Sequence, residues 1–175
     1  MRLILLSFAF ALTALAHASA GQLTVAIIQY GQLKTIEDLN AAFAGQKLYE
    51  VTDSNRTISK VSDLKAGDVL FAQTIAASSG SPFASTTRLN NNRADVEGKL
   101  SDGRISVTVD LSEGIKAGLR NFQKRVYTGS GSLSGGSPVI LSMRQIHGKS
   151  PSITKNQVKM DSFDLTIVLV AQYTP

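Results

Sequence analysis

The sequence contains no cysteine and no tryptophan among its 175 residues. Without cysteine the chain cannot form disulfide bonds, thiol-based active sites or thiolate metal sites, so the hydrophobic core alone must stabilise the fold. Small secreted domains of eukaryotes usually depend on disulfides, and their absence therefore favours a bacterial protein. The absence of tryptophan counts against a typical carbohydrate-binding cleft.

Histidine and aromatic residues are also scarce. The chain has two histidines, and one of them, His17, lies in an apolar N-terminal segment, which leaves His147. One histidine without cysteine excludes a transition-metal cluster, and we expect no metal and no cofactor. Aromatic residues make up 6% of the chain, too few for the two interfacial girdles of an outer-membrane barrel. An eight-stranded outer-membrane barrel remains an alternative because the length of the chain suits it.

Residues 1–20 have the pattern of a cleaved secretory signal peptide. Arg2 supplies a positive charge, Leu3–Leu15 is an uncharged apolar run, and Ala18-Ser19-Ala20 places small residues at positions −3 and −1 relative to the cleavage site. The apolar run is shorter than the roughly 18–20 residues that span a bilayer. We therefore predict export, a mature chain that begins at Gly21, and no transmembrane helix after cleavage.

The mature chain has the size of one domain and a mild basic charge. Cleavage after Ala20 leaves 155 of the 175 residues, and a second match to the cleavage pattern, Ala16-His17-Ala18, leaves two more. A chain of this length buries about 70% of its unfolded surface, and no linker divides it, so residues 21–175 are predicted to form a single domain. Removing Arg2 lowers the formal net charge from +5 to +4, which favours an anionic partner.

Short apolar runs separated by turn residues predict an all-β domain. Arg104–Leu111 alternates between apolar and polar residues, as in a sheet with one buried face, and Asp102-Gly103 before it is typical of a hairpin turn. No βαβ spacing is present, which argues against a parallel sheet. We predict a single antiparallel β-sandwich of about seven or eight strands with one or two short helices. The other predicted strands are Leu23–Tyr30, Lys47–Thr52, Asp68–Ile75, Phe122–Thr128, Pro138–Ile146 and Phe163–Tyr173.

Helices and loops are predicted between these strands. Thr35 caps a helix with acidic residues in its first turn, and Gly45 suits its end. A second helix is predicted to begin at Ser112, with a strand from Phe122 onward as the alternative. The predicted loops are Ala76–Ser85, Asn90–Gly98 and Gly129–Ser137.

The first and last predicted strands resemble each other. Within the first strand, the segment from Thr24 ends in Gln29-Tyr30, and within the last, the segment from Thr166 ends in Gln172-Tyr173, with an apolar run in each. No fixed period separates them, so they are not a repeat. We predict that both are buried core strands and that they are neighbours.

Catalytic motifs are few. His147 can belong to a Ser-His-Asp triad, whose members meet in space, but no serine lies in a Gly-x-Ser-x-Gly elbow. Gly148-Lys149-Ser150 lacks the first glycine of a phosphate-binding loop, and Asp53–Thr57 lacks the glycine and glutamate of a calcium loop. A small secreted hydrolase is therefore the alternative to a non-enzymatic protein. It predicts a concave pocket in which His147 lies beside a carboxylate and a hydroxyl.

Basic residues in the C-terminal half are the strongest candidates for binding. Four lie within ten positions, and three follow on a predicted strand and turn. They are Lys116, Arg120, Lys124, Arg125, Arg144, His147 and Lys149. If the two segments are neighbours, they form one positive patch suited to sulfate, phosphate or carboxylate groups. An ordinary solvated face is the alternative.

Together these features predict an exported, non-enzymatic binding or assembly protein of the bacterial envelope or extracellular space, either periplasmic or secreted. The predicted partner is an envelope or extracellular protein, or an anionic glycan or lipid headgroup. Nucleic acid is not expected, because the chain is predicted to leave the cytoplasm. An interaction subunit further predicts an exposed apolar patch or an unprotected sheet edge.

Overall fold

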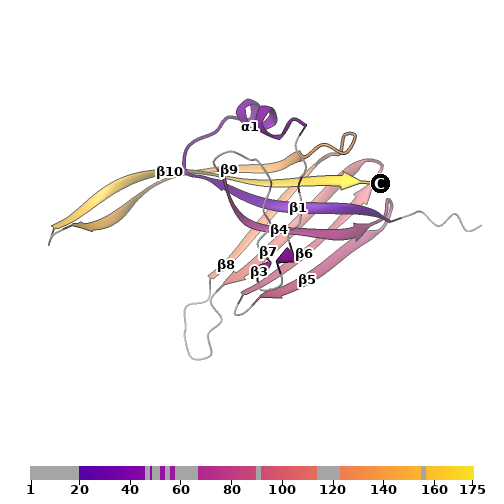
Figure 1. Ribbon diagram of the computed structural model, residues 1–175, viewed down its shortest axis with the longest axis horizontal. Coiled ribbons are helices and arrows are strands. Elements are labelled where there is room, and N and C mark those ends of the chain that lie inside the picture. Colours follow the sequence, from indigo (N-terminus) through magenta and orange to yellow (C-terminus); the bar gives the residue numbers. More distant parts are fainter. Residues whose placement is uncertain are drawn as a thin grey trace, which may run out of the picture.

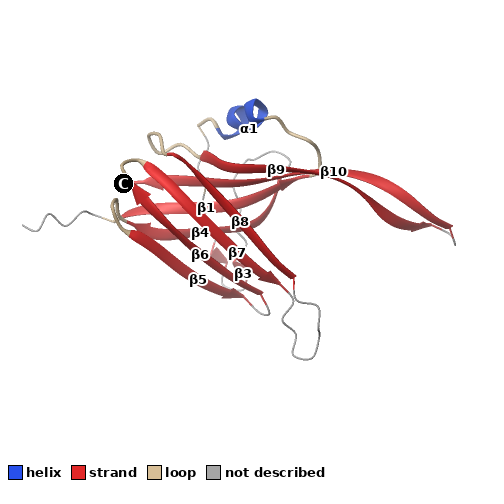
Figure 2. Ribbon diagram, turned by 180° about the vertical axis from the view of Figure 1, so that it is seen from behind, coloured by secondary structure: helices blue, strands red, loops and turns tan. Residues whose placement is uncertain are grey.

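The computed structural model describes residues 20–45, 48, 52–53, 56–57, 67–89, 92–113, 123–154 and 157–175. Within these ranges the protein is an antiparallel β-sandwich of two four-stranded sheets with one short helix (Figures 1 and 2). The predicted fold class is therefore confirmed. The predicted signal peptide lies outside the described residues except for Ala20, and the first strand begins at Gly21.

The sheets differ in how they are assembled from the chain. Sheet I contains, in order, β4 (Gly67–Ala77), β1 (Gly21–Tyr30), β10 (Gln157–Thr174) and β9 (Val139–Thr154). Sheet II contains β5 (Pro82–Leu89), β6 (Asn92–Ser101), β7 (Arg104–Glu113) and β8 (Gln123–Ser132). The helix α1 spans Ile36–Phe43, and the two-residue strands β2 (Thr52–Asp53) and β3 (Arg56–Thr57) pair with each other. Sheet II is a meander of consecutive strands, whereas sheet I brings both ends of the described chain together.

The main core lies between the two sheets. Alternate residues of β7 point into it, as the alternation in the sequence predicts: Ile105, Val107, Val109 and Leu111 are all buried. They pack against inward-facing side chains of sheet I, among them Ile27, Ile167 and Leu169. The turn that precedes β7 is the predicted hairpin turn. Asp102 and Gly103 have φ values of +50° and +71°, as a two-residue turn with both central residues left-handed requires.

The strand β1 and the part of β10 that pairs with it, from Thr166 to Gln172, are buried on both faces, which explains why these segments are nearly continuously apolar. They pair antiparallel from Gln22 opposite Thr174 to Tyr30 opposite Thr166, so the predicted neighbourhood of the two similar segments is confirmed. Their second face is covered by α1, which contributes Leu39 and Phe43 to a second core cluster. No helix in the described part of the chain has the length and hydropathy needed to cross a bilayer.

The helix α1 begins at the predicted cap. The Asp38 amide donates to Thr35 Oγ1 at 3.1 Å, and the Thr35 amide donates to Asp38 Oδ2 at 3.2 Å. These reciprocal bonds satisfy N–H groups that the first turn of a helix leaves free. The hydrogen bonds from Thr35 also hold the pKa of the Asp38 carboxyl below its usual value. The predicted end at Gly45 fits as well, because its φ of +70° is the left-handed conformation that glycine adopts without strain.

Two of the predicted loops are wrong. The strand β5 begins at Pro82, inside the predicted loop Ala76–Ser85, and β6 occupies most of the predicted loop Asn90–Gly98. The strand β5 is an edge strand, where proline at the first residue is tolerated. In β6 the buried residues Ala94, Val96 and Leu100 alternate with charged ones, but the asparagines before them and Gly98 among them are residues typical of loops.

Two further predictions, the loop Gly129–Ser137 and the helix from Ser112, agree only partly with the structure. The strand β8 continues to Ser132, so the predicted loop Gly129–Ser137 is wrong in its first half. For the predicted second helix, Ser112 belongs to β7, and residues 114–122 lie outside the described residues. The alternative of a strand from Phe122 onward agrees with β8, which begins at Gln123.

The strands β9 and β10 extend well beyond the sandwich. They have 16 and 18 residues, whereas β1 has 10. Pairing of β10 with β1 ends at Thr166, but pairing with β9 continues to Gln157 opposite Thr154. The outer parts of β9 and β10 therefore form a two-stranded ribbon that projects from the body of the protein (Figure 1). We call residues 147–154 and 157–164 the β9–β10 ribbon.

The base of this ribbon is tied to the segment that leads into α1. The buried Thr166 Oγ1 accepts a hydrogen bond from the Lys34 amide at 2.9 Å and donates to the Gln32 carbonyl at 2.9 Å. On β9, Gln145 Nε2 donates to the Lys34 carbonyl, also at 2.9 Å. The chain after β1 therefore crosses the face of the sheet next to the ribbon instead of continuing as a third strand beside it.

Candidate functional site

The predicted basic residues fall on two different sheets. Lys124 and Arg125 lie on β8 of sheet II, and Arg144, His147 and Lys149 lie on β9 of sheet I. Lys116 and Arg120 lie outside the described residues. The single positive patch therefore stays a prediction, and the two described groups have distinct surroundings.

On β8, the two neighbouring cations occupy opposite faces of sheet II. Arg125 lies opposite the core residue Leu111 and so faces the same side as the core, at the exposed end of the strand. Lys124 faces outward, and its Nζ lies 2.6 Å from Asp110 Oδ2. These two residues therefore cannot both contribute to one flat patch on sheet II.

On β9, the ribbon places His147 next to an acidic partner. His147 Nδ1 lies 2.9 Å from Asp164 Oδ1, its cross-strand partner, and the two side chains are 65% and 52% exposed. Lys149 lies two residues further along the same face, and Arg144 lies on the opposite face, across from the core residue Ile167. Exposed pairs of this kind contribute about 0–1 kcal/mol to stability.

A shallow hollow of about 380 Å³ surrounds this pair on the ribbon, lined by His147, Gly148, Lys149, Ser162 and Asp164. It contains the histidine, carboxylate and hydroxyl that the hydrolase alternative predicts. However, both His147 and Asp164 are more than half exposed, whereas the aspartate of a Ser-His-Asp triad is buried. The arrangement is an exposed contact between a histidine and a carboxylate on the surface of the ribbon.

Sequence reasoning missed a row of basic side chains at one end of the outer face of sheet II. Arg88 on β5 lies directly opposite Arg93 on β6, and Ser112 on β7 lies between Arg93 and Lys124. We call the three basic residues, Arg88, Arg93 and Lys124, the basic row. The alternation along each strand places the row on the face that points away from the core. The pairing of Arg88 with Arg93 was not predicted, because Arg93 lies in the segment Asn90–Gly98 that was predicted to be a loop.

Two carboxylates of the next row partly neutralise the basic row. Asp95 Oδ2 lies 2.6 Å from Arg93 Nε, Asp95 Oδ1 accepts hydrogen bonds from Arg93 Nη2 at 2.9 Å and from Thr86 Oγ1 at 2.6 Å, and Asp110 pairs with Lys124. The Arg93 guanidinium is the main cause that lowers the pKa of the Asp95 carboxyl, so Asp95 is ionised at neutral pH. Two like charges directly opposite each other are unfavourable in a sheet, and Asp95 offsets that repulsion for Arg88 and Arg93.

Replacing Asp95 by asparagine is expected to strengthen binding of polyanions. The variant removes the negative charge that neutralises Arg93 and leaves the basic row with one more net positive charge. Because these groups are exposed, we expect a gain of about two- to fivefold in affinity at low salt. Retention on an immobilised sulfated polysaccharide measures the effect as a higher eluting salt concentration. Glu97→Gln is the matched control, because it makes the same charge change on the same face of β6. Equal shifts for both variants would show that only net charge matters.

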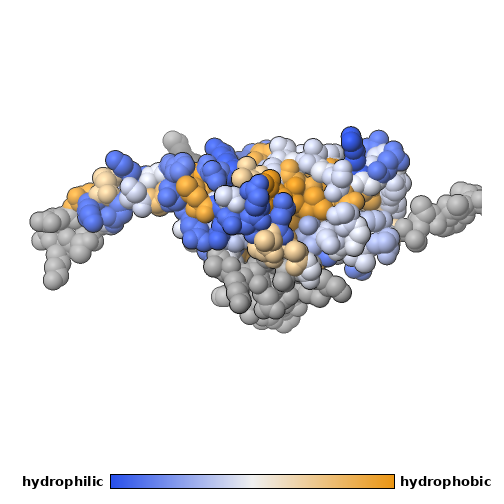
Figure 3. Space-filling view, turned by 90° about the horizontal axis from the view of Figure 1, so that it is seen from above, coloured by the Kyte–Doolittle hydropathy of each residue, from blue (hydrophilic) through white to orange (hydrophobic). Residues whose placement is uncertain are grey.

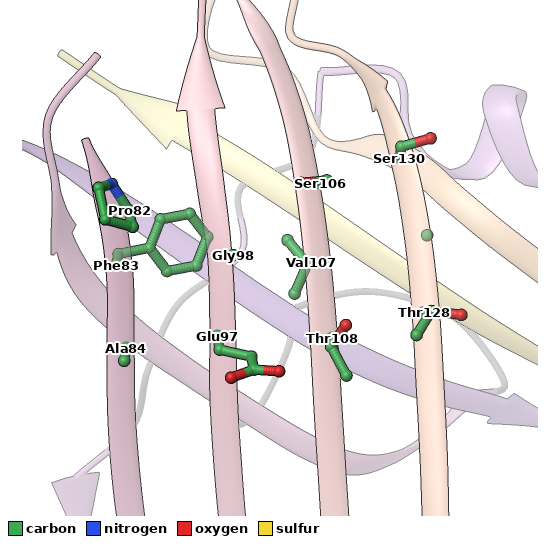
Figure 4. A pocket seen from close by; sticks show the side chains of 11 residues that line it. Pro82, Phe83, Ala84, Glu97, Gly98, Ser106, Val107, Thr108, Thr128 and Ser130 are labelled. Atoms are coloured by element: carbon green, nitrogen blue, oxygen red, sulfur yellow. The ribbon is translucent and has the colours of Figure 1, made fainter. Parts of the chain in front are cut away.

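A second hollow, of about 700 Å³, opens on sheet II near the centre of its strands (Figure 4). Its polar lining consists of hydroxyl groups and one carboxylate, from Ser106, Thr108, Thr128, Ser130 and Glu97. Such a surface can donate and accept hydrogen bonds, but its described lining contains no cation. Within the described ranges, no group of three or more histidine, aspartate or glutamate residues is arranged to hold a metal ion.

Two residues of the β9–β10 ribbon, Val158 and Met160, are the most exposed large apolar side chains that the structure describes. Val158, Met160 and Phe163 are 69%, 56% and 37% exposed. The ring of Phe163 lies over Gly148 on the opposite strand, where a Cβ atom would collide with it. Along the projecting ribbon, Figure 3 shows hydrophobic side chains interspersed with hydrophilic ones.

Comparisons with known proteins show only a distant likeness. No family model and no curated protein matches the chain. The type II secretin GspD from enteropathogenic Escherichia coli aligns with a TM-score of 0.35 and 11% identity over 89% of this chain. The secretin-domain β-barrel of InvG from the Salmonella SPI-1 injectisome aligns with a TM-score of 0.30 and 10% identity, also over 89%. The chain spans 65% and 61% of the lengths of these two chains. The structural similarity to secretin domains is therefore weak.

Proposed function

We propose that this protein is an exported, non-enzymatic binding or assembly component of a bacterial envelope or the extracellular space, and that the β9–β10 ribbon is its contact element. The observation that carries the proposal is the ribbon itself. It projects past the sandwich, has no third strand beside it among the described residues, and exposes Val158, Met160 and Phe163. An isolated two-stranded hairpin is marginally stable in water, so a partner that covers the ribbon would stabilise it.

Export is the part of the proposal that rests on sequence. The uncharged apolar run after Arg2 and the small residues before Gly21 are typical of a signal peptide. The absence of cysteine fits a domain that holds its fold by packing alone. A periplasmic or secreted location follows from this segment, and a partner in the envelope or extracellular space follows from the location.

The basic row supplies a second, weaker contact. Its cations lie at one end of sheet II, and Arg88 has no ion-pair partner within the described ranges. An anionic glycan or lipid headgroup could engage Arg88 and Arg93 without displacing a buried group. We place this contact second because Asp95 and Asp110 already neutralise much of the row.

Fractionation of cells that produce the full chain tests the proposal. We expect a mature protein whose intact mass begins at Gly21 or Ser19, located outside the cytoplasm, and chemically crosslinked to an envelope or extracellular component. The measurement is intact-mass spectrometry of each fraction together with identification of the crosslinked neighbours. An uncleaved chain in the cytoplasmic fraction with no crosslinked neighbour would contradict both the location and the role.

A further inference from the structure

The open edge of β10 is the surface that the ribbon offers for strand pairing. From Gln157 to Leu165, β10 pairs with β9 on one side, and no described residue pairs with its other side. The outer edge of β9 in the ribbon carries Pro151, which has no N–H to donate to a further strand. The open segment of β10 contains neither proline nor glycine. Proline is one of the devices that block pairing at a strand edge, and in the described part of the ribbon only the β9 edge carries one.

Two oppositely charged residues flank Met160 on this edge. Val158, Met160 and Ser162 point to one face of the ribbon, and Lys159 and Asp161 point to the other. Lys159 Nζ lies 3.4 Å from Asp161 Oδ1, and these side chains are 79% and 51% exposed. A cation therefore precedes Met160 by one residue, and an anion follows it by one residue.

We propose that a second copy of this chain pairs antiparallel with the open edge of β10 about a two-fold axis through Met160. This inference rests on the proposed function, because it names the partner of the ribbon. In this register Lys159 lies opposite the partner's Asp161 and Asp161 lies opposite the partner's Lys159. Opposite charges facing each other across a strand pair are favourable. A symmetric contact of this kind closes as a dimer.

The same register also brings together the exposed side chains of Val158 and Met160 from the two copies. Met160 lies opposite the partner's Met160, and Val158 lies diagonally next to it on the same face. The four apolar side chains of the two copies therefore form one cluster on one face of a four-stranded sheet. Lys159 and Asp161 of the two copies lie on the other face, where each lysine is opposite an aspartate of the partner. In this register apolar side chains therefore meet on one face of the joined sheet, and opposite charges meet on the other.

Neighbouring registers are unfavourable. A two-fold axis through Asp161 would place two Asp161 side chains directly opposite each other, and an axis through Lys159 would do the same with two Lys159 side chains. Like charges in that position destabilise a sheet. A shift by one residue would instead place the apolar side chains of the two copies on opposite faces. Of the registers compared, the one about Met160 is the only one that pairs opposite charges and keeps the apolar side chains of both copies on one face.

Engineered cysteines test the register, since the chain has no cysteine of its own. Opposite residues of an antiparallel pair have Cα atoms about 4.5–5.5 Å apart, a distance that a disulfide spans. We expect Met160→Cys to form a covalent dimer under mild oxidation. Val158→Cys alone should not do so, because it lies opposite the partner's Ser162. A mixture of Val158→Cys and Ser162→Cys should give the mixed covalent dimer.

Charge variants test the interface without relying on oxidation. Lys159→Asp and Asp161→Lys should each raise the dimer dissociation constant by about tenfold, because each places like charges opposite each other. Mixing the two variants should restore dimers that contain one copy of each, and the double variant K159D/D161K should dimerise like the original chain. Lys99→Glu, an exposed change on β6 of sheet II, is the control that leaves the dimer intact. Sedimentation velocity measures the oligomeric state, and circular dichroism shows that each variant is folded.

Three results would overturn the inference. The first is a chain that stays monomeric at high concentration with Met160→Cys uncrosslinked, which leaves the proposed function standing if the ribbon still crosslinks to another envelope component. The second is a dimer whose dissociation constant is unchanged by the charge variants and that does not crosslink through Met160→Cys. Such a dimer uses a different surface. The third is a monomeric chain whose ribbon binds lipid vesicles, because the partner of the ribbon would then be a membrane and not a second copy.

Discussion

Replacing Leu169 by alanine is expected to lower the free energy of unfolding by about 2–5 kcal/mol. Leu169 is 1% exposed and lies in the core between the sheets, on β10. The strand is paired on both sides, with β1 and β9, so it cannot move far to fill the cavity that alanine leaves. Because β10 also forms one strand of the ribbon, this core position couples the stability of the sandwich to the contact element. Urea unfolding followed by circular dichroism measures the loss.

Leu33→Ala is the matched control for this prediction. It removes the same atoms, but Leu33 is 39% exposed and lies before α1, outside both core clusters. Its truncation should therefore lower the free energy of unfolding by much less than that of Leu169. Equal losses at the two positions would contradict the described core.

Replacing Gly129 by alanine is expected to lower the free energy of unfolding by about 1–3 kcal/mol, because the site has no room for a methyl group. Gly129 lies where β8 of sheet II passes close to β9 of sheet I. A Cβ atom there would lie 2.7 Å from the carbonyl carbon of Leu141 and 2.8 Å from its carbonyl oxygen. These are backbone atoms, so one sheet must move to relieve the collision. The loss is measured as a lower midpoint of urea unfolding.

Gly131→Ala provides the control on the same strand. A Cβ atom at Gly131 would lie 3.1 Å from Leu141 Cδ2, the end of a flexible side chain that can rotate away. Alanine also restricts the unfolded chain more than glycine does, which favours the folded state by about 0.4–1 kcal/mol where the conformation is compatible. We therefore expect little change or a small gain. A loss as large as that of Gly129→Ala would show that the loss at Gly129 does not come from the close backbone approach at that position.

Much of the fold could be predicted because several segments carry strong local signals. The alternation of β7 and the Asp102-Gly103 turn before it identify a hairpin with one buried face. The apolar runs of β1 and β10 reflect burial between the core and α1. Thr35 and Asp38 carry the capping pattern of α1 within four residues. In each case the determining interactions are local or follow from burial alone.

The parts that could not be predicted depend on pairing between distant residues. The strand β5 is polar and begins with Pro82, so only its partner β6 identifies it as a strand. Gly148 and Pro151 interrupt the pattern of β9, although Phe163 fills the space beside Gly148 and Pro151 sits at an outer edge. The sequence alone therefore did not predict how far β9 and β10 extend into the ribbon.

The candidate site was limited for the same reason. The basic residues of β8 and β9 were grouped by their distance in sequence, but Lys124 and Arg125 face opposite sides of sheet II. The basic row instead arises from the β5–β6 register, which places Arg88 opposite Arg93. Charge can be counted from the sequence, but the face on which each charge lies depends on strand register.

Site-specific photocrosslinking in cells that produce the full chain tests most directly whether the ribbon is the contact element. A photoreactive amino acid is placed at Val158 on the ribbon or at Val126 on β8, two valines that are 69% and 54% exposed. We predict that position 158 crosslinks to an envelope protein or to a second copy of the chain, and that position 126 gives far less product. Equal crosslinking from both positions, or product from position 126 alone, would contradict the account.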